Sequence, residues 1–169
     1  MEGNKTKPRA ILVFGAPCSG KTTFASNFAK KFSLAYYDLA TIKEDNKLSH
    51  KDIILILELI SRTKQNVVIE GCLDTESARS EIRSVFYNAG YEPALVWIQT
   101  DVSTIRNRMK FKFKSVAKAK EEYNSAVEAL EAPSDNEHPI ILSGKHTFET
   151  QNKHVISGLA DFNTNDRKR

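Results

Sequence analysis

The sequence is poor in the features that mark export, cysteine-based metal binding or membrane insertion. It has only two cysteines, Cys18 and Cys72, in 169 residues, which is too few for a disulfide scaffold and gives no zinc-type spacing. The longest apolar run, residues 53–60, is interrupted by Glu58 and is far shorter than the roughly 20 residues that span a membrane. Residues 1–7 are polar, and no signal-type apolar core follows them. We therefore expect a cytoplasmic protein that does not contact membranes.

Neither the charge nor the hydrophobicity of the chain is extreme. Hydrophobic residues make up 40% of it, charged residues 27%, and the formal net charge is +4. A chain of this size and composition fits one domain, which we place at 9–160, between a flexible N-terminus at 1–8 and a flexible tail at 161–169. The small positive surplus suits an anionic ligand. A nucleic-acid partner is compatible with it but not required.

Short apolar segments alternate with helical patterns along the chain. β-rich runs that end near Gly or Asp predict parallel strands at 9–14, 34–37, 66–70, 94–99 and 140–142. Amphipathic spacing and caps predict the intervening helices, which include 21–32, the run at 53–60 capped by Ser49, 102–114, 116–130 and 147–159. This alternation predicts an α/β fold, a doubly wound five-stranded parallel sheet with helices on both faces.

Residues 15–22, GAPCSGKT, match G-x-x-x-x-G-K-[ST] between a predicted strand and a predicted helix. Glycines let backbone N–H groups turn toward phosphate oxygens, and the positive end of the helix dipole favours an anion. Lys21 suits the β- and γ-phosphates, and the Thr22 hydroxyl suits Mg²⁺. The motif therefore predicts ATP and Mg²⁺ as cofactors, with Lys21 catalytic and the nucleotide held by Gly15, Ala16, Pro17, Cys18, Ser19, Gly20, Lys21, Thr22 and Thr23.

The segment GAPCSGKTT resembles the GxPGSGKS loop of small P-loop kinases, in particular the polynucleotide-kinase-like and nucleoside-monophosphate-kinase-like group. The resemblance implies the strand order 2-3-1-4-5 and a helical lid at about 102–131. Cys18 departs from the family, which often has glycine at that position.

Two residues after the second predicted strand match the acceptor site that the resemblance implies. Asp38 falls where the family has an acceptor-site aspartate, and Lys43 falls where a basic residue holds the acceptor's phosphate. A carboxylate at that place accepts the proton of an attacking hydroxyl if it lies within hydrogen-bond reach. The alternative role of Asp38 is to cap the following turn.

Glu70 ends the third predicted strand, which neighbours the first in this fold. Its carboxylate should therefore point toward the Mg²⁺ region of the phosphate loop, and it binds the metal directly or through a water. The alternative is an ordinary acid at a strand end.

The segment IRNRMKFK resembles the start of the lid, where kinases of this type carry arginines for the transferring phosphate. Arg108 is our first candidate for this catalytic role and Arg106 the second, because guanidinium groups suit the charge on phosphoryl oxygens. The alternative is a solvated basic helix, since lysines continue the charge beyond the lid start.

These features together predict an ATP-dependent kinase. No Asn-Lys-x-Asp sequence is present to read guanine, and the loop at 143–147 should lie near the adenine. The acceptor stays open: a nucleoside, a nucleotide, a polynucleotide end or a small hydroxyl compound. Two alternatives are a regulatory ATPase without phosphotransfer and a zeta-toxin-like kinase of sugar nucleotides. A further hypothesis is that the thiols of Cys18 and Cys72 approach each other and respond to redox conditions.

Overall fold

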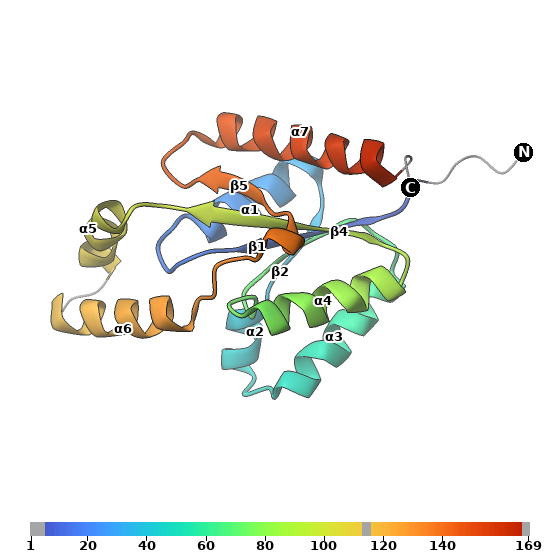
Figure 1. Ribbon diagram of the computed structural model, residues 1–169. Helices are drawn as coiled ribbons and strands as arrows, with labels where there is room; N and C mark the ends of the chain where they lie inside the picture. The colour runs from blue at the N-terminus through green and yellow to red at the C-terminus, as the bar shows by residue number, and fades with distance from the viewer. Residues whose placement is uncertain (1–5, 113–115, 167–169) are drawn as a thin grey trace, which may run out of the picture.

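The computed structural model describes residues 6–112 and 116–166. Its centre is one sheet of five parallel strands in the order β2-β3-β1-β4-β5 (Figure 1). The strands are β1 (Arg9–Phe14), β2 (Ala35–Asp38), β3 (Val67–Glu70), β4 (Glu92–Gln99) and β5 (Ile140–Ser143). The predicted fold class and strand order are both confirmed.

Helices cover both faces of the sheet. α1 (Lys21–Phe32) and α7 (Phe148–Asp166) pack on one face, and α3 (His50–Arg62) and α4 (Glu76–Asn88) on the other (Figure 1). Each face has its own buried apolar cluster, and β1 in the middle contributes to both. The central strands are apolar on both faces because neither face meets water.

Local sequence signals explain where the covering helices begin. In α1, the rings of Phe24 and Phe28 lie four residues apart with their centroids at 5.5 Å, on the face buried against the sheet. α3 begins with a capping box between Ser49 and Asp52, and Thr75 caps α4 by accepting from the Ala78 N–H at 3.1 Å. These caps satisfy backbone donors that the first turn of a helix leaves free.

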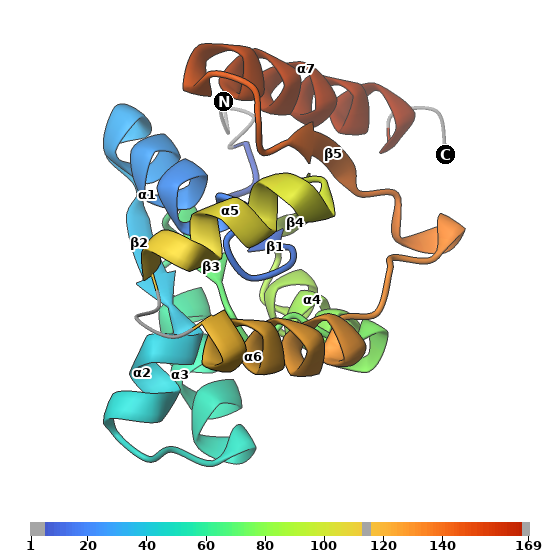
Figure 2. The same cartoon turned by 90° about the vertical axis from the view of Figure 1, so that its left-hand side faces the viewer.

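Three further helices lie between β4 and β5 in the described part of the chain. α5 (Val102–Lys112) and α6 (Val116–Ala129) lie beyond the carboxyl ends of the strands, on either side of the β1–α1 loop (Figure 2). Ile105 and Met109 of α5 pack with Tyr123 of α6 against Ala16 and Cys18 of that loop. A short 3₁₀ helix, η1 (Asp135–Glu137), precedes β5. In the part of the chain that is described, no helix is both long and apolar enough to cross a membrane.

The largest differences from the predicted elements are after β2 and at the end of α7. A short helix, α2 (Leu39–Asp45), follows β2, and the last helix continues to Asp166 instead of ending at 159, so residues 161–166 are helical rather than part of a tail. Polar residues at the end of α7 hid its length because they carry no apolar periodicity. Most of the predicted N-terminal segment, 1–5, and the last three residues, 167–169, lie outside the described residues, as do 113–115 between α5 and α6.

Candidate functional site

The loop between β1 and α1 turns tightly at two glycines. Gly20 is the N-cap of α1 in the left-handed conformation, with φ 105°, and a Cβ on Gly15 would overlap the Ile98 carbonyl oxygen of β4. Larger residues would strain both positions. Because glycine has no capping side chain, the first N–H groups of α1 point toward an anion site.

Lys21 lies back over this loop. Its Nζ donates to the Ala16 carbonyl oxygen at 3.5 Å, so the positive charge stays beside the backbone of the loop. The side chain is half-buried, which limits screening of its charge by water.

Thr22 and Glu70 join the start of α1 to the end of β3. The Thr22 hydroxyl donates to Glu70 Oε1 at 2.6 Å, and the Glu70 side chain is 2% exposed. Burial raises the pKa of the Glu70 carboxyl, while the hydrogen bond from Thr22 works against that rise. Glu70 Oε2 is buried without a hydrogen-bond partner among the described residues. A lone buried carboxylate oxygen costs free energy unless a cation or a donor meets it.

This pair fits Mg²⁺. Oxygen ligands from one hydroxyl and one carboxylate, completed by water and phosphate oxygens, are the usual set for Mg²⁺ beside a nucleotide. Within the described residues there is no group of three or more His, Cys, Asp or Glu side chains that could hold a metal by itself. The donor set therefore suits a metal that arrives with a nucleotide.

Tyr36 of β2 lies next to Glu70 and was not singled out in the sequence. Burial raises the pKa of its hydroxyl above the usual range, and the nearby carboxylates of Glu70 and Asp38 raise it further. The phenol therefore stays protonated, so it can donate its hydrogen to a carboxylate such as that of Glu70 or accept from a donor. No sequence pattern marks it, because tyrosine in a strand is ordinary.

Asp38 is the N-cap of α2. Its Oδ1 accepts from the Thr41 N–H at 3.1 Å and its Oδ2 accepts from the Thr41 hydroxyl at 2.7 Å. The capping role that the sequence left open is thus present, and both carboxylate oxygens have local donors. Asp38 also lies beside Glu70 in the β2–β3 register. Lys43 lies one turn further along α2, where its charge opposes the rise that burial gives the pKa of the Cys72 thiol.

Arg108 of α5 connects its helix to two loops at the carboxyl end of the sheet, β1–α1 and β5–α7. Its Nη1 donates to the Cys18 and Ser19 carbonyl oxygens, both at 3.1 Å, and its Nη2 donates to the Gly144 carbonyl oxygen at 2.8 Å. Arg106 is exposed and, two positions earlier on the helix, points roughly 200° away from Arg108. Of these two arginines, only Arg108 lines the cavity described in the next paragraph.

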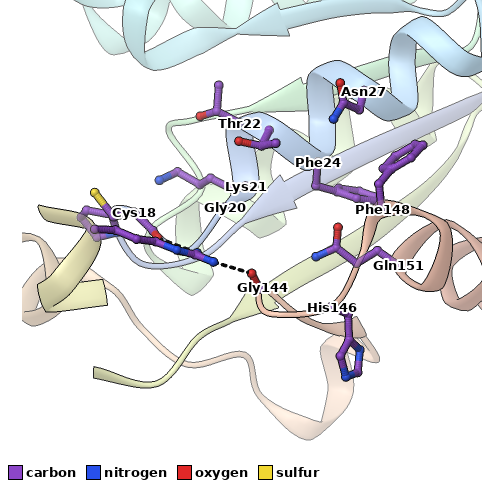
Figure 3. A pocket seen from close by; sticks show the side chains of 13 residues that line it. Cys18, Gly20, Lys21, Thr22, Phe24, Asn27, Gly144, His146, Phe148 and Gln151 are labelled. Atoms are coloured by element: carbon purple, nitrogen blue, oxygen red, sulfur yellow. Dashed lines mark hydrogen bonds between the residues drawn. The ribbon is translucent and has the colours of Figure 1, made fainter. Parts of the chain in front are cut away.

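A cavity of about 570 Å³ opens beside the phosphate loop (Figure 3). Its volume suits a small-molecule ligand. The lining comes from the phosphate loop, α1, Arg108, the β5–α7 loop and α7: Pro17, Cys18, Gly20, Lys21, Thr22, Thr23, Phe24, Asn27, Arg108, Gly144, His146, Phe148 and Gln151. The β5–α7 loop packs closely against the phosphate loop at Gly144, where a Cβ would overlap both the Ser19 carbonyl oxygen and the Thr100 hydroxyl. Glycine at this position therefore permits the close approach.

Comparison with known proteins agrees with this architecture. The family model for "Chromatin associated protein KTI12" matches residues 10–86, a little under half of the chain. No curated protein matches the chain. A gluconokinase from Sinorhizobium meliloti 1021 superimposes with a TM-score of 0.69 at 18% identity, over 95% of this chain and 97% of that one. The chain has the P-loop kinase fold.

Two further structures with this fold were solved with nucleotide analogues. Kti12 from Chaetomium thermophilum, in complex with ADP-AlF3, has a TM-score of 0.68 at 20% identity, over 90% of this chain and 97% of that one. The Mycobacterium tuberculosis APS kinase CysC, in complex with AMPPNP and APS, has a TM-score of 0.66 at 17% identity, over 91% and 98%. At such identities the likeness establishes the P-loop kinase fold and not a subgroup of it.

Within this fold the structure brings some predicted residues together and separates others. The phosphate loop, Lys21, Thr22, Glu70 and Arg108 surround one site, and the loop at 143–147 contributes Gly144 and His146 to its cavity. Phe148 and Gln151 of α7 were missed, because neither belongs to a motif. Cys18 and Cys72 are both free thiols that pack against different apolar clusters, which gives no support to their proposed approach.

Proposed function

We propose that this chain binds ATP with Mg²⁺ at residues 15–23 and transfers the γ-phosphoryl group to a hydroxyl or phosphate acceptor. The observation that carries the proposal is the hydrogen bond from Thr22 to Glu70, 2.6 Å long, directly behind a phosphate loop. It joins a hydroxyl and a buried carboxylate where the metal of a bound nucleotide would lie.

Each residue of the loop has a definite task in this proposal. The N–H groups at the start of α1 bind the phosphates, and Lys21 leaves the Ala16 carbonyl for the β- and γ-phosphate oxygens. Thr22 and Glu70 hold the metal, Glu70 directly or through a water. When bound, Mg²⁺ supplies positive charge that neutralises the phosphate oxygens during transfer.

The acceptor lies on the β2–α2 side of the loop in this proposal. An acceptor oxygen forms a bond to the γ-phosphorus, the bond from that phosphorus to the β-bridging oxygen breaks, and ADP leaves. Asp38 takes the acceptor proton on a carboxylate lone pair that its two bonds to Thr41 leave available, and Lys43 holds a phosphate on the acceptor. Helices α5 and α6 form the lid, which brings Arg108, and at its edge Arg106, toward the transferred group.

A specific observation favours a second candidate, an ATP-dependent regulatory protein that transfers nothing to an acceptor. Asp38 already has both oxygens engaged as a helix cap, which is the role it would keep in such a protein. The partial match to the KTI12 family, whose description is a chromatin-associated protein and not a kinase, points the same way.

The test is ADP release from ATP–Mg²⁺, measured with and without pools of nucleosides, nucleotides, oligonucleotide ends and sugars. A kinase releases ADP fast only with one acceptor pool, and phosphorus NMR then finds a new phosphate ester. Release that no pool accelerates supports the regulatory ATPase instead. The matched control is Lys21→Ala, which keeps the fold but loses ADP release in either case. Normal turnover by that variant would exclude both functions.

A further inference from the structure

The cavity beside the phosphate loop contains a buried polar side chain that phosphate chemistry does not use. Gln151 in the first turn of α7 is only 7% exposed, and it lines the cavity with His146 and Phe148 (Figure 3). Buried amides are retained where both of their polar atoms find partners. For Gln151, the protein supplies a hydrogen-bond partner to the amide nitrogen.

That partner fixes the orientation of the amide. Gln151 Nε2 donates to the Ser143 carbonyl oxygen at 2.8 Å. A carbonyl oxygen only accepts, so the nitrogen must face Ser143 and the amide oxygen must face the other way. Gln151 Oε1 is therefore an acceptor held in place at the wall of the cavity, ready for a ligand that donates.

The geometry of a bound nucleotide determines which ligand atom meets that wall. With the phosphates at the start of α1, the base extends through the cavity away from Lys21. In a purine, the substituent at position 6 lies on the ring edge remote from the ribose, so it reaches the wall that the β5–α7 loop and α7 build. The Gly144 carbonyl of that loop already accepts from Arg108 Nη2, which leaves it less able to serve a base.

We propose that Gln151 Oε1 accepts a hydrogen bond from the 6-amino group of adenine, so that Gln151 makes the site select 6-aminopurine over 6-oxopurine nucleotides. The inference rests on the proposed binding of ATP. A 6-oxo group would place a second acceptor against Oε1 and leave a buried polar atom without a partner. Sites that read a substrate through such an atom discriminate well against analogues that cannot pair with it.

The direct test compares ADP with IDP, which differ at position 6, by calorimetric titration in the presence of Mg²⁺. We expect the unmodified protein to bind ADP at least about tenfold more tightly than IDP, the effect of one hydrogen bond gained and one acceptor left unpaired. In Gln151→Met, which keeps the length of the side chain, ADP binding should weaken until the affinities for ADP and IDP differ by less than about twofold. IDP binding should change little.

The matched control is Gln65→Met, at an exposed position between α3 and β3 that is not part of the cavity lining, which should keep the tenfold preference. N6,N6-dimethyl-ADP tests the same bond without a mutation, since it lacks the donated hydrogen, and it should bind the unmodified protein about tenfold more weakly than ADP. Equal affinity for ADP and IDP, or a preference that survives in Gln151→Met, would overturn the inference while leaving ATP binding intact. Failure to bind any nucleotide would overturn the proposed function as well.

Discussion

Arg79 is the largest fully buried side chain in the described part of the molecule, and its replacement should be costly. The guanidinium donates to both oxygens of Glu137, at 2.7 and 2.9 Å, and to the carbonyl oxygens of Leu73, Asp74 and Glu131, and it lies 4.7 Å from the centre of the Phe14 ring. Arg79 holds the pKa of Glu137 below its usual value, so the pair is ionised at neutral pH. Removing Arg79 takes its charge and donors away from three backbone carbonyls and from the buried Glu137 carboxylate, which keeps only the Ser134 N–H at 3.0 Å.

The expected loss follows from that geometry. Removing one partner of a buried ion pair costs about 3–5 kcal/mol, because the remaining charge stays desolvated. For a chain of this size, Arg79→Leu should therefore lower the melting temperature by about 6–20 °C. Urea unfolding followed by circular dichroism measures the free energy, and a thermal scan measures the shift. The control is Arg62→Leu at an exposed position of α3, which should change stability by less than about 0.5 kcal/mol.

A double variant separates the lost charge pair from the lost packing. Arg79→Leu combined with Glu137→Leu removes both charges, so its loss should be smaller than the sum of the two single losses by about 1–3 kcal/mol. A loss for Arg79→Leu below about 1 kcal/mol, or strict additivity in the double variant, would refute the view that this pair ties the segment after α6 to the start of α4.

Three predictions concern the site itself. Asp38→Asn should lower kcat for phosphotransfer at least about tenfold with little change in ATP affinity, if Asp38 accepts the acceptor proton; equal kcat values would leave it as a cap only. Arg108→Ala should reduce kcat more than ATP affinity, and Arg108→Lys should restore little of the loss, whereas Lys110→Ala, exposed on the same helix, should be harmless; equal effects at the two positions would contradict the lid assignment. Burial raises the pKa of Glu70 above its unfolded value, so the nucleotide-free protein should lose stability as pH rises through and above about 4.5, the ordinary value. Glu70→Gln should remove that pH-dependent loss in urea titrations and should weaken Mg²⁺-dependent nucleotide binding. Parallel stability profiles for the two proteins would disprove the role of Glu70 in this pH dependence.

The fold could be predicted because its signals are local and repeated. β1 and α1 have the predicted bounds, since an apolar run, a glycine loop and phenylalanines four residues apart leave few alternatives. The short helix α2 escaped prediction because its seven residues carry no helical period and depend on the Asp38 cap. The sequence supplied the cap but not which of two roles the carboxylate plays.

Residues that belong to no motif could not be predicted. Arg79 lies on α4, and its partner Glu137 comes 58 positions later in the short helix η1. The partner of Gln151, Ser143, is only eight positions away, but no motif marks this glutamine, and only that contact shows that its amide is fixed. Such positions are defined by tertiary contacts that no periodicity records.

The phosphate loop and the β5–α7 loop meet at the Ser19 carbonyl. The contacts there bear on the choice between a kinase and a regulatory ATPase. This carbonyl accepts from Arg108 Nη1 at 3.1 Å and from the Thr100 hydroxyl at 2.8 Å, and Gly144 packs directly against it. The Arg108 guanidinium donates to three backbone carbonyl oxygens, which are neutral acceptors. A phosphoryl oxygen is charged and forms a stronger bond than a neutral carbonyl. The proposed role of Arg108 in phosphotransfer therefore predicts that α5 moves and that Arg108 exchanges carbonyl partners for the phosphoryl group. A regulatory ATPase can keep the present contacts, and the position of Arg108 with a nucleotide and an acceptor bound therefore separates the two functions.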